Sequence, residues 1–157
     1  MIRANIIAAA SVAILTLSPT AFAQQPSQFG TADQAKGMLT KAVVAVKADK
    51  TKALDMFNKG EGGFLDRDIF PFCFNRSDGK IVATQTKQAL GGDVRTFKDP
   101  TGKAFGLELY AAAEKPEGQV SEVNYMFAKP GPDTTPASKV SFASKAGDLG
   151  CAVGYYK

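Results

Sequence analysis

Few residues in this chain are of the types that most often do chemistry. The sequence contains no histidine, and its two cysteines are Cys73 and Cys151. A nucleophilic cysteine needs a base to form its thiolate, and the usual imidazole is absent. A zinc site built on two thiolates would need carboxylates to complete its four ligands. We therefore predict neither a catalytic cysteine nor a metal site.

Residues 1–23 indicate where the chain acts. Arg3 supplies one positive charge, small and apolar residues fill positions 6–17, and Ala21-Phe22-Ala23 matches the pattern at a signal-peptidase cleavage site. The apolar run is short for a transmembrane helix. The pattern predicts a signal peptide over 1–23, a polar lead-in over 24–30, and a periplasmic or secreted mature chain. An uncleaved N-terminal anchor is the alternative.

Export favours a disulfide between Cys73 and Cys151, because exported compartments are oxidising. On the chain-entropy model, a disulfide that closes so long a loop contributes about 4–5 kcal/mol to stability. That is a large share of the total for a small domain. Two buried, reduced thiols are the alternative.

The charged residues give little support to catalysis or to nucleic-acid binding. The net charge is +4, and the lysines are scattered rather than clustered. An extended Asp66-Arg67-Asp68 would place two carboxylates on one side, but too few further ligands lie nearby for calcium, so we interpret it as a solvent-exposed link. A general base would have to be a carboxylate, lysine or tyrosine, and no constellation supports one. We predict no enzymatic activity, no cofactor and no nucleic-acid partner.

Residues 31–59 have the apolar spacing of a long helix. Thr31 and Gln34 form a capping-box pattern at its start. The stretch 47–53 lacks a large apolar residue, so the helix is expected to bend or restart there. The apolar stripe can pack on the chain's own sheet, and part of it can meet a second copy, which would give a homodimer through 31–59.

After this helix, the apolar residues recur at the two-residue spacing of strands. A hairpin is expected over 69–84, with a bulge or an unpaired N–H at Pro71, and a loop with one helical turn follows over 86–102. A second helix is expected over 104–113, and strands over 119–128, 139–144 and 151–157. These elements predict an α+β fold: one five-stranded antiparallel sheet with helices on one side. The helical insert between strands 2 and 3 is expected to leave a space for a small ligand.

Several stretches, in this order, resemble a known family. They are SDGKIVA, LGGDVRTFKDPTGKAFGLELYAAAEKPEG, VNYMFAKPG followed by SKVSFASK, and the final VGYYK. Over residues 31–157 they resemble a single Cache domain of type 2, a PAS-like extracytoplasmic sensor domain. The resemblance implies a free-standing periplasmic form, first and last strands that lie side by side with Cys73 and Cys151, and a pocket that receives a small organic ligand such as a carboxylate.

The chain departs from the family pattern in two places. Thr84-Gln85 stands where the family often has His-Pro after the second strand, and Met126-Phe127-Ala128 where it often has Arg-Trp-Pro in the third. Lys139 and Tyr125 fall where the family places a lysine and an aromatic residue.

These observations predict a ligand site. Lys139 shares a strand face with Ser141 and would face an anion, Arg95 would clamp one with its fork of donors, and aromatic side chains would wall the pocket. A solvated lysine, a surface arginine and ordinary core aromatics are the structural alternatives. The candidate ligand-binding residues are Lys139, Tyr125, Phe127, Ser141, Tyr110, Phe105, Arg95 and Thr84.

Two functions of different classes follow. The leading hypothesis is a non-catalytic periplasmic module that binds and senses a small molecule, a short organic acid, with a membrane receptor as a further partner. The alternative is a structural or protein-interaction domain whose pocket is filled by its own side chains, and which pairs with a membrane receptor or with itself.

Overall fold

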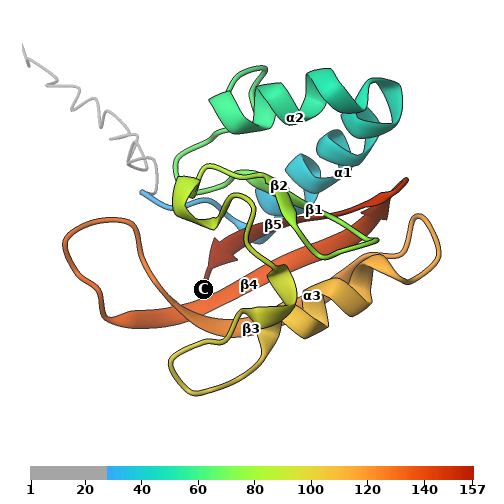
Figure 1. The fold of residues 1–157 in the computed structure, drawn as a ribbon. Coiled ribbons are helices and arrows are strands. Elements are labelled where there is room, and N and C mark those ends of the chain that lie inside the picture. The colour runs from blue at the N-terminus through green and yellow to red at the C-terminus, as the bar shows by residue number, and fades with distance from the viewer. Residues whose placement is uncertain (1–27) are drawn as a thin grey trace, which may run out of the picture.

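The computed structural model describes residues 28–157 (Figure 1). The predicted signal peptide and the first part of the polar lead-in lie outside the described residues. The fold begins with helix α1 (Ala32–Ala48). The side chain of Thr31 accepts a hydrogen bond from the Gln34 N–H, and the Gln34 side chain accepts one from the Thr31 N–H, so the predicted capping box is present.

The predicted restart of the long helix is also present. Helix α1 ends at Asp49, whose carboxylate accepts a hydrogen bond from the Lys52 N–H and so caps helix α2 (Lys50–Lys59). Helix α2 ends at Gly60, which has a φ of 71° and closes the last turn in the left-handed conformation that glycine adopts most readily. The stretch without large apolar residues is therefore a corner between two helices.

The five strands form one antiparallel sheet in the order β2-β1-β5-β4-β3. A three-residue turn η1 (Lys87–Ala89), a second turn η2 (Val94–Thr96) and helix α3 (Phe105–Ala113) lie between β2 and β3 as the predicted insert. Strand β1 starts at Pro71, and its pairing with β2 shifts between Cys73 and Phe74, so the irregularity expected at Pro71 lies two residues further along. The strands are β1 (Pro71–Asn75), β2 (Ile81–Ala83), β3 (Ser121–Ala128), β4 (Pro136–Ala146) and β5 (Leu149–Tyr156).

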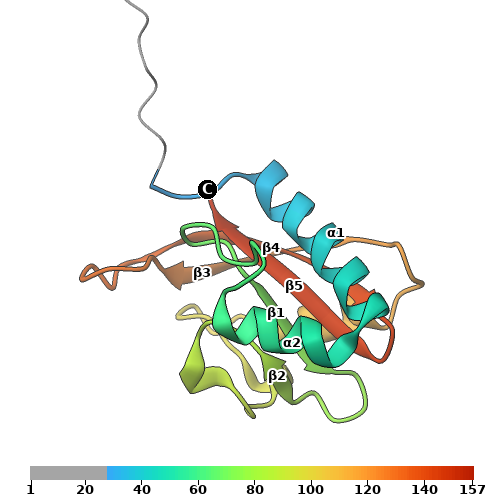
Figure 2. The same ribbon diagram turned by 90° about the horizontal axis from the view of Figure 1, so that it is seen from above.

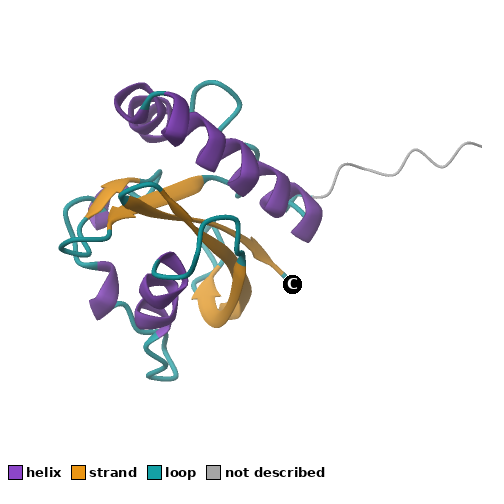
Figure 3. Cartoon of the chain, turned by 90° about the vertical axis from the view of Figure 1, so that its right-hand side faces the viewer, coloured by secondary structure: helices purple, strands orange, loops and turns teal. Residues whose placement is uncertain are grey.

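Helices cover both faces of the sheet, whereas the sequence analysis placed them on one side. Figure 3 shows the sheet between the α1–α2 pair and α3. Viewed from above, α1 lies over β4 and β5 (Figure 2). The reason lies in these central strands: Val140 and Phe142 of β4 pack in the α1 layer, while Ser141 and Ala143 point to the opposite side and are equally buried. A strand buried on both faces needs cover on both.

Cys73 and Cys151 form the predicted disulfide, with Cα atoms 4.1 Å apart. They are directly opposite each other in the β1–β5 pairing, so the bond joins the first strand to the last. Both cysteines are fully buried in the core layer under α1 and α2. The disulfide therefore stabilises the core layer on the face of the sheet opposite α3.

The apolar stripe of α1 and α2 packs on the chain's own sheet. Its buried members contact β1, β4 and β5, and Val44 is the large apolar side chain of α1 that stays exposed. A homodimer through these helices remains an untested prediction. Among residues 28–157, no helix is long and apolar enough to cross a membrane.

Candidate functional site

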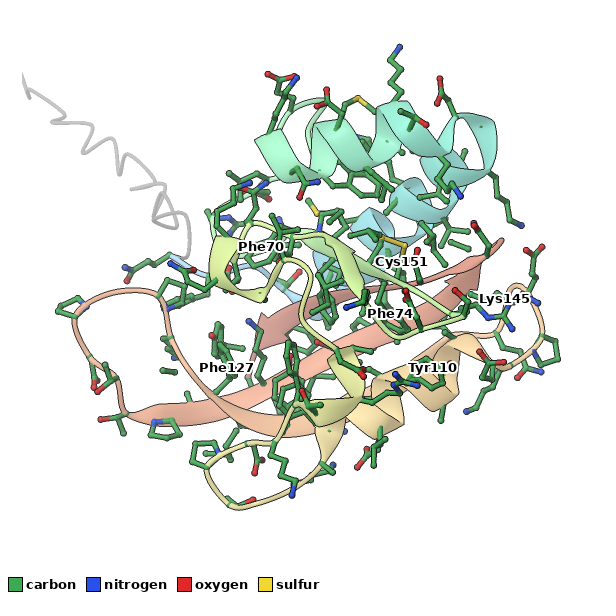
Figure 4. All side chains as sticks on the ribbon, in the orientation of Figure 1. Phe70, Phe74, Tyr110, Phe127, Lys145 and Cys151 are labelled. Atoms are coloured by element: carbon green, nitrogen blue, oxygen red, sulfur yellow. A yellow bond between two sulfur atoms is a disulfide. The ribbon has the colours of Figure 1, made fainter. Side chains whose placement is uncertain are left out.

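A cavity of about 450 Å³ lies on the α3 face of the sheet, between the strands and the insert. Its floor comes from β1, β3, β4 and β5, and its cover comes from the loop that carries η1 and η2. In Figure 4, Phe70 and Phe127 lie on the same side of the molecule, and both belong to this cavity. The lining residues are Asp68, Phe70, Phe72, Ile81, Thr84, Thr86, Gln88, Ala89, Thr96, Phe97, Lys98, Phe105, Tyr125, Phe127, Lys139, Ser141 and Gly154.

Aromatic rings form the walls. The rings of Phe105 on α3 and Tyr125 on β3 stack nearly parallel with centroids 4.0 Å apart. Phe127 meets Tyr125 edge-on at 6.2 Å and keeps 44% of its surface exposed, which places it at the mouth. Such walls suit the apolar part of a small ligand and exclude water from its polar part.

Of the two lysines that line the cavity, Lys139 lies on the sheet and is half-buried, whereas Lys98 is exposed. Lys139 lies in register between Tyr125 on one side and Tyr156 on the other, so the three side chains share one face of the sheet. Its Nζ donates a hydrogen bond of 3.3 Å to the Tyr156 hydroxyl and lies 4.3 Å from the centre of that ring and 5.3 Å from the ring of Phe127. The ammonium is therefore framed by two aromatic rings.

Gly154 makes room for this lysine. A Cβ at position 154 would lie 2.7 Å from Cε of Lys139 and 2.9 Å from Oγ of Ser141. Any larger residue at this position would make the end of the lysine side chain and the Ser141 hydroxyl shift. The hydroxyls of Ser141 and Tyr125 lie 2.8 Å apart and hydrogen-bond each other beneath the stem.

Burial shifts the proton equilibria of these groups. It lowers the pKa of Lys139 to about 8, while the charge of Asp68 acts in the opposite direction. Burial raises the pKa of Tyr125 to about 12, while its hydrogen bond with Ser141 acts in the opposite direction, and burial also raises the pKa of Tyr156. At neutral pH the cavity therefore holds a protonated lysine and two neutral phenols.

Asp68 is the anion of the cavity, and the sequence analysis was wrong to treat it as part of a solvent-exposed link. Asp66 and Ile69 exchange two backbone hydrogen bonds of 2.9 Å around a tight turn in which Arg67 has a φ of 56°. This turn leaves Asp66 outside, paired with Arg67, and turns Asp68 inward, where 6% of it is exposed. The Oδ1 atom of Asp68 accepts a hydrogen bond of 2.7 Å from the Gly30 N–H.

The structure brings six of the eight candidate residues together around the cavity: Lys139, Tyr125, Phe127, Ser141, Phe105 and Thr84. Their role in ligand binding stays a prediction. The structure places the other two, Tyr110 and Arg95, elsewhere.

Tyr110 points to the far end of the sheet, away from Phe70 and Phe127 (Figure 4). Its ring stacks on Phe74, and its hydroxyl donates a hydrogen bond to the backbone carbonyl of Arg76. It lies five residues beyond Phe105 in α3 and packs, half-buried, against the core on this face of the sheet.

Arg95 forms a two-bond ion pair with Asp93 at 2.7 and 2.9 Å and donates to the carbonyl oxygen of Asp78. Its donors are directed to the β1–β2 turn, so they do not face the cavity.

The sequence analysis missed several lining residues for a common reason. Thr86, Gln88, Phe97 and Lys98 come from the irregular cover, where no period indicates which side chains point inward. The three phenylalanines of the hairpin divide between cavity and core: Phe70 and Phe72 line the cavity, while Phe74 is fully buried.

No family model and no curated protein matches the chain. Solved structures do. A methyl-accepting chemotaxis protein from Vibrio parahaemolyticus aligns with a TM-score of 0.61 at 20% identity, over 79% of this chain and 86% of that chain. A periplasmic sensor domain of a chemotaxis protein aligns with a TM-score of 0.57 at 20% identity, over 79% and 88%.

A third similar structure is that of a Cache chemosensory domain, studied for the basis of carboxylic acid recognition. It aligns with a TM-score of 0.56 at 22% identity, over 79% of this chain and 86% of that chain. This chain has the Cache fold. The α+β, PAS-like architecture predicted from the sequence is thereby confirmed, and the cavity lies between the sheet and the insert of that Cache fold.

Proposed function

We propose that this protein is a non-catalytic periplasmic module that binds and senses a small organic acid. The observation that carries the proposal is the ammonium of Lys139, held among aromatic rings in a cavity of about 450 Å³. A carboxylate placed there would exchange water for a charge-assisted hydrogen bond from a partly desolvated lysine, which is stronger than the same pair in solvent.

The similar structures support this proposal by their context. One is a Cache chemosensory domain that recognises carboxylic acids, and another is a periplasmic sensor domain. The sequence pattern over residues 1–23 agrees with export. A membrane receptor that reads the occupied state is the partner that such a module would need.

The alternative of a pocket filled by its own side chains receives no support from the cavity. The space is open, and the tip of Lys139 borders it rather than filling it. We therefore place ligand binding before a purely structural role.

A thermal-shift screen of the oxidised protein tests the proposal, with short carboxylates, amino acids and purines as probes. A probe at a hundred times its Kd should add about 2.7 kcal/mol to the free energy of unfolding, seen as a raised Tm. Lys139→Ala should abolish the shift. Lys52→Ala, a change of the same kind on exposed α2 across the sheet, should keep it. A flat panel at millimolar concentrations would refute ligand binding.

A further inference from the structure

The structure points to a more specific class of ligand. We propose that the ligand is a zwitterion of the amino-acid type, whose carboxylate binds Lys139 and whose ammonium binds Asp68. This inference rests on the proposed function, because it concerns the same cavity. It adds a second recognition group that the sequence did not indicate.

One carboxylate oxygen of Asp68 is available to a ligand. Its Oδ1 is occupied by the Gly30 N–H, but its Oδ2 is buried and has no hydrogen-bond partner within residues 28–157. A buried carboxylate oxygen without a donor is costly, and such groups in native proteins call for an explanation. Asp68 lines the cavity, so a donor on the ligand would reach this oxygen.

The opposite charges of Lys139 and Asp68 favour a ligand that carries both charges. Lys139 donates its hydrogen bond to the Tyr156 hydroxyl, so it leaves Oδ2 of Asp68 unpaired. The two charges nevertheless influence each other, because Asp68 raises the pKa of Lys139. The pair sums to zero, and the other charged lining residue, Lys98, is exposed to solvent. A simple carboxylate would add a second negative charge near Asp68, whereas a zwitterion leaves the charge of the Lys139–Asp68 pair unchanged and gives both groups a partner.

Both charged side chains are held in place by their own contacts. Asp68 is fixed by the 66–69 turn and by the Gly30 N–H, and Lys139 is fixed by Tyr156 and by the space that Gly154 leaves. Two fixed opposite charges in one apolar cavity select a ligand with two matching charges, since each unmatched group would stay desolvated.

The test compares matched acids with and without the amine: glycine with acetate, alanine with propionate, leucine with 4-methylpentanoate, and phenylalanine with 3-phenylpropanoate. N-acetylated forms of the four amino acids remove the positive charge and keep the carboxylate. Calorimetry at neutral pH should show the best amino acid binding about tenfold to a hundredfold more tightly than its two partners.

Asp68→Asn is the decisive variant, because its Oδ1 can still accept the Gly30 N–H and a thermal melt will show whether the fold is kept. It should remove the preference for the amine and leave affinity for the plain acid equal or higher. Asp55→Asn, on exposed α2, is the matched control and should change neither affinity.

The outcomes separate the two proposals. Plain acids that bind as tightly as their amino counterparts, or an unchanged preference in Asp68→Asn, would overturn the zwitterion and leave the proposed function standing. If no member of any pair binds, the proposed function and the zwitterion fail together.

Discussion

The neighbours of Lys139 reduce its hydration and thereby set its pKa. A surface lysine keeps its full hydration, but this one lies against Tyr156 and Phe127 over the space left by Gly154. Burial therefore lowers its pKa to about 8, which lies close enough to neutrality for titration to be measurable.

The affinity for a plain carboxylate should depend on pH through Lys139. The protonated lysine binds the anion, so affinity should be constant below the pKa of about 8 and fall as pH rises through it, approaching tenfold per unit. The raised pKa values of Tyr125 and Tyr156 keep both phenols neutral over this range. Calorimetry with an amine-free acid between about pH 6.5 and pH 9.5 measures the profile.

Two variants control this result. Lys139→Gln should bind weakly with a flat profile, and Lys139→Arg should keep binding to higher pH, because a guanidinium does not lose its proton in this range. A pH profile in Lys139→Gln that matches the parent would assign the titration to another group.

Lys139, Tyr125 and Asp68 show which site residues can be predicted from the sequence and which cannot. Lys139 and Tyr125 were found because alternation on a strand and a family likeness both point to them. Asp68 was missed because alternation was applied to a segment that is a turn. A left-handed residue at Arg67 reverses the side on which the next side chain lies, and arginine carries no sequence signal for that conformation.

At the scale of elements, one carboxylate ties the cover of the cavity to the sheet. Asp99 accepts three hydrogen bonds from its own loop, from the Thr101 N–H, the Thr101 hydroxyl and the Lys103 N–H, through Oδ1. Its Oδ2 accepts the Met126 N–H at 3.0 Å, which ties the loop to edge strand β3. Phe97 and Lys98, directly before it, line the cavity.

Asp99→Ala should release this loop from β3. We expect a lower Tm, faster hydrogen exchange at the Met126 amide and weaker ligand binding, because the cover loses its anchor. Asp133→Ala is the matched control, since that carboxylate accepts the Thr135 N–H of its own exposed loop and should leave exchange at Met126 unchanged. Normal protection of Met126 in Asp99→Ala would show that other contacts hold the cover.

The Asp99 carboxylate should also make the stability of the fold depend on pH. Hydrogen bonds from Thr101 first, and then from Met126, lower the pKa of Asp99 to about 2, below its value of about 3.9 in an unfolded chain. A depressed pKa stabilises the fold fully above about pH 4, and this contribution is lost as pH falls through about 2. The drop in Tm on acidification should therefore be smaller in Asp99→Ala.

Most elements were predictable, but their layers were not. The capping box at Thr31, the restart before α2 and the strand periods are local signals, and all of them are present in the structure. Which face each helix covers depends on residues such as Ser141 and Ala143, which are small enough to look like either face in the sequence. Packing between distant segments decides that question.

At the scale of the whole molecule, the cavity charges contact both ends of the described chain. Asp68 accepts the Gly30 N–H just before α1, and Lys139 donates to Tyr156 near the end of β5. The rings of Phe29 and Tyr156 lie 5.8 Å apart, so the two ends are neighbours (Figure 2). A ligand that binds both charges would therefore act on both ends at once, which is the geometry a partner at that end could read.

The disulfide lies in the core layer under α1 and α2, on the other side of the sheet from α3. Its loss should therefore lower the stability of the fold without changing the affinity for a ligand. Cys73 and Cys151 are buried under α1 and α2, and neither lines the cavity. The double variant Cys73→Ala/Cys151→Ala should lower the free energy of unfolding by about 4–5 kcal/mol, because the unfolded chain regains the entropy of a long loop. Denaturant unfolding measures this loss. Under conditions where the variant stays folded, its ligand affinity should equal that of the parent, since Lys139 is held by Tyr156 and Asp68 by the Gly30 N–H, and neither contact involves the disulfide. A loss of affinity in the folded variant would mean that the β1–β5 junction sets the cavity as well as the core.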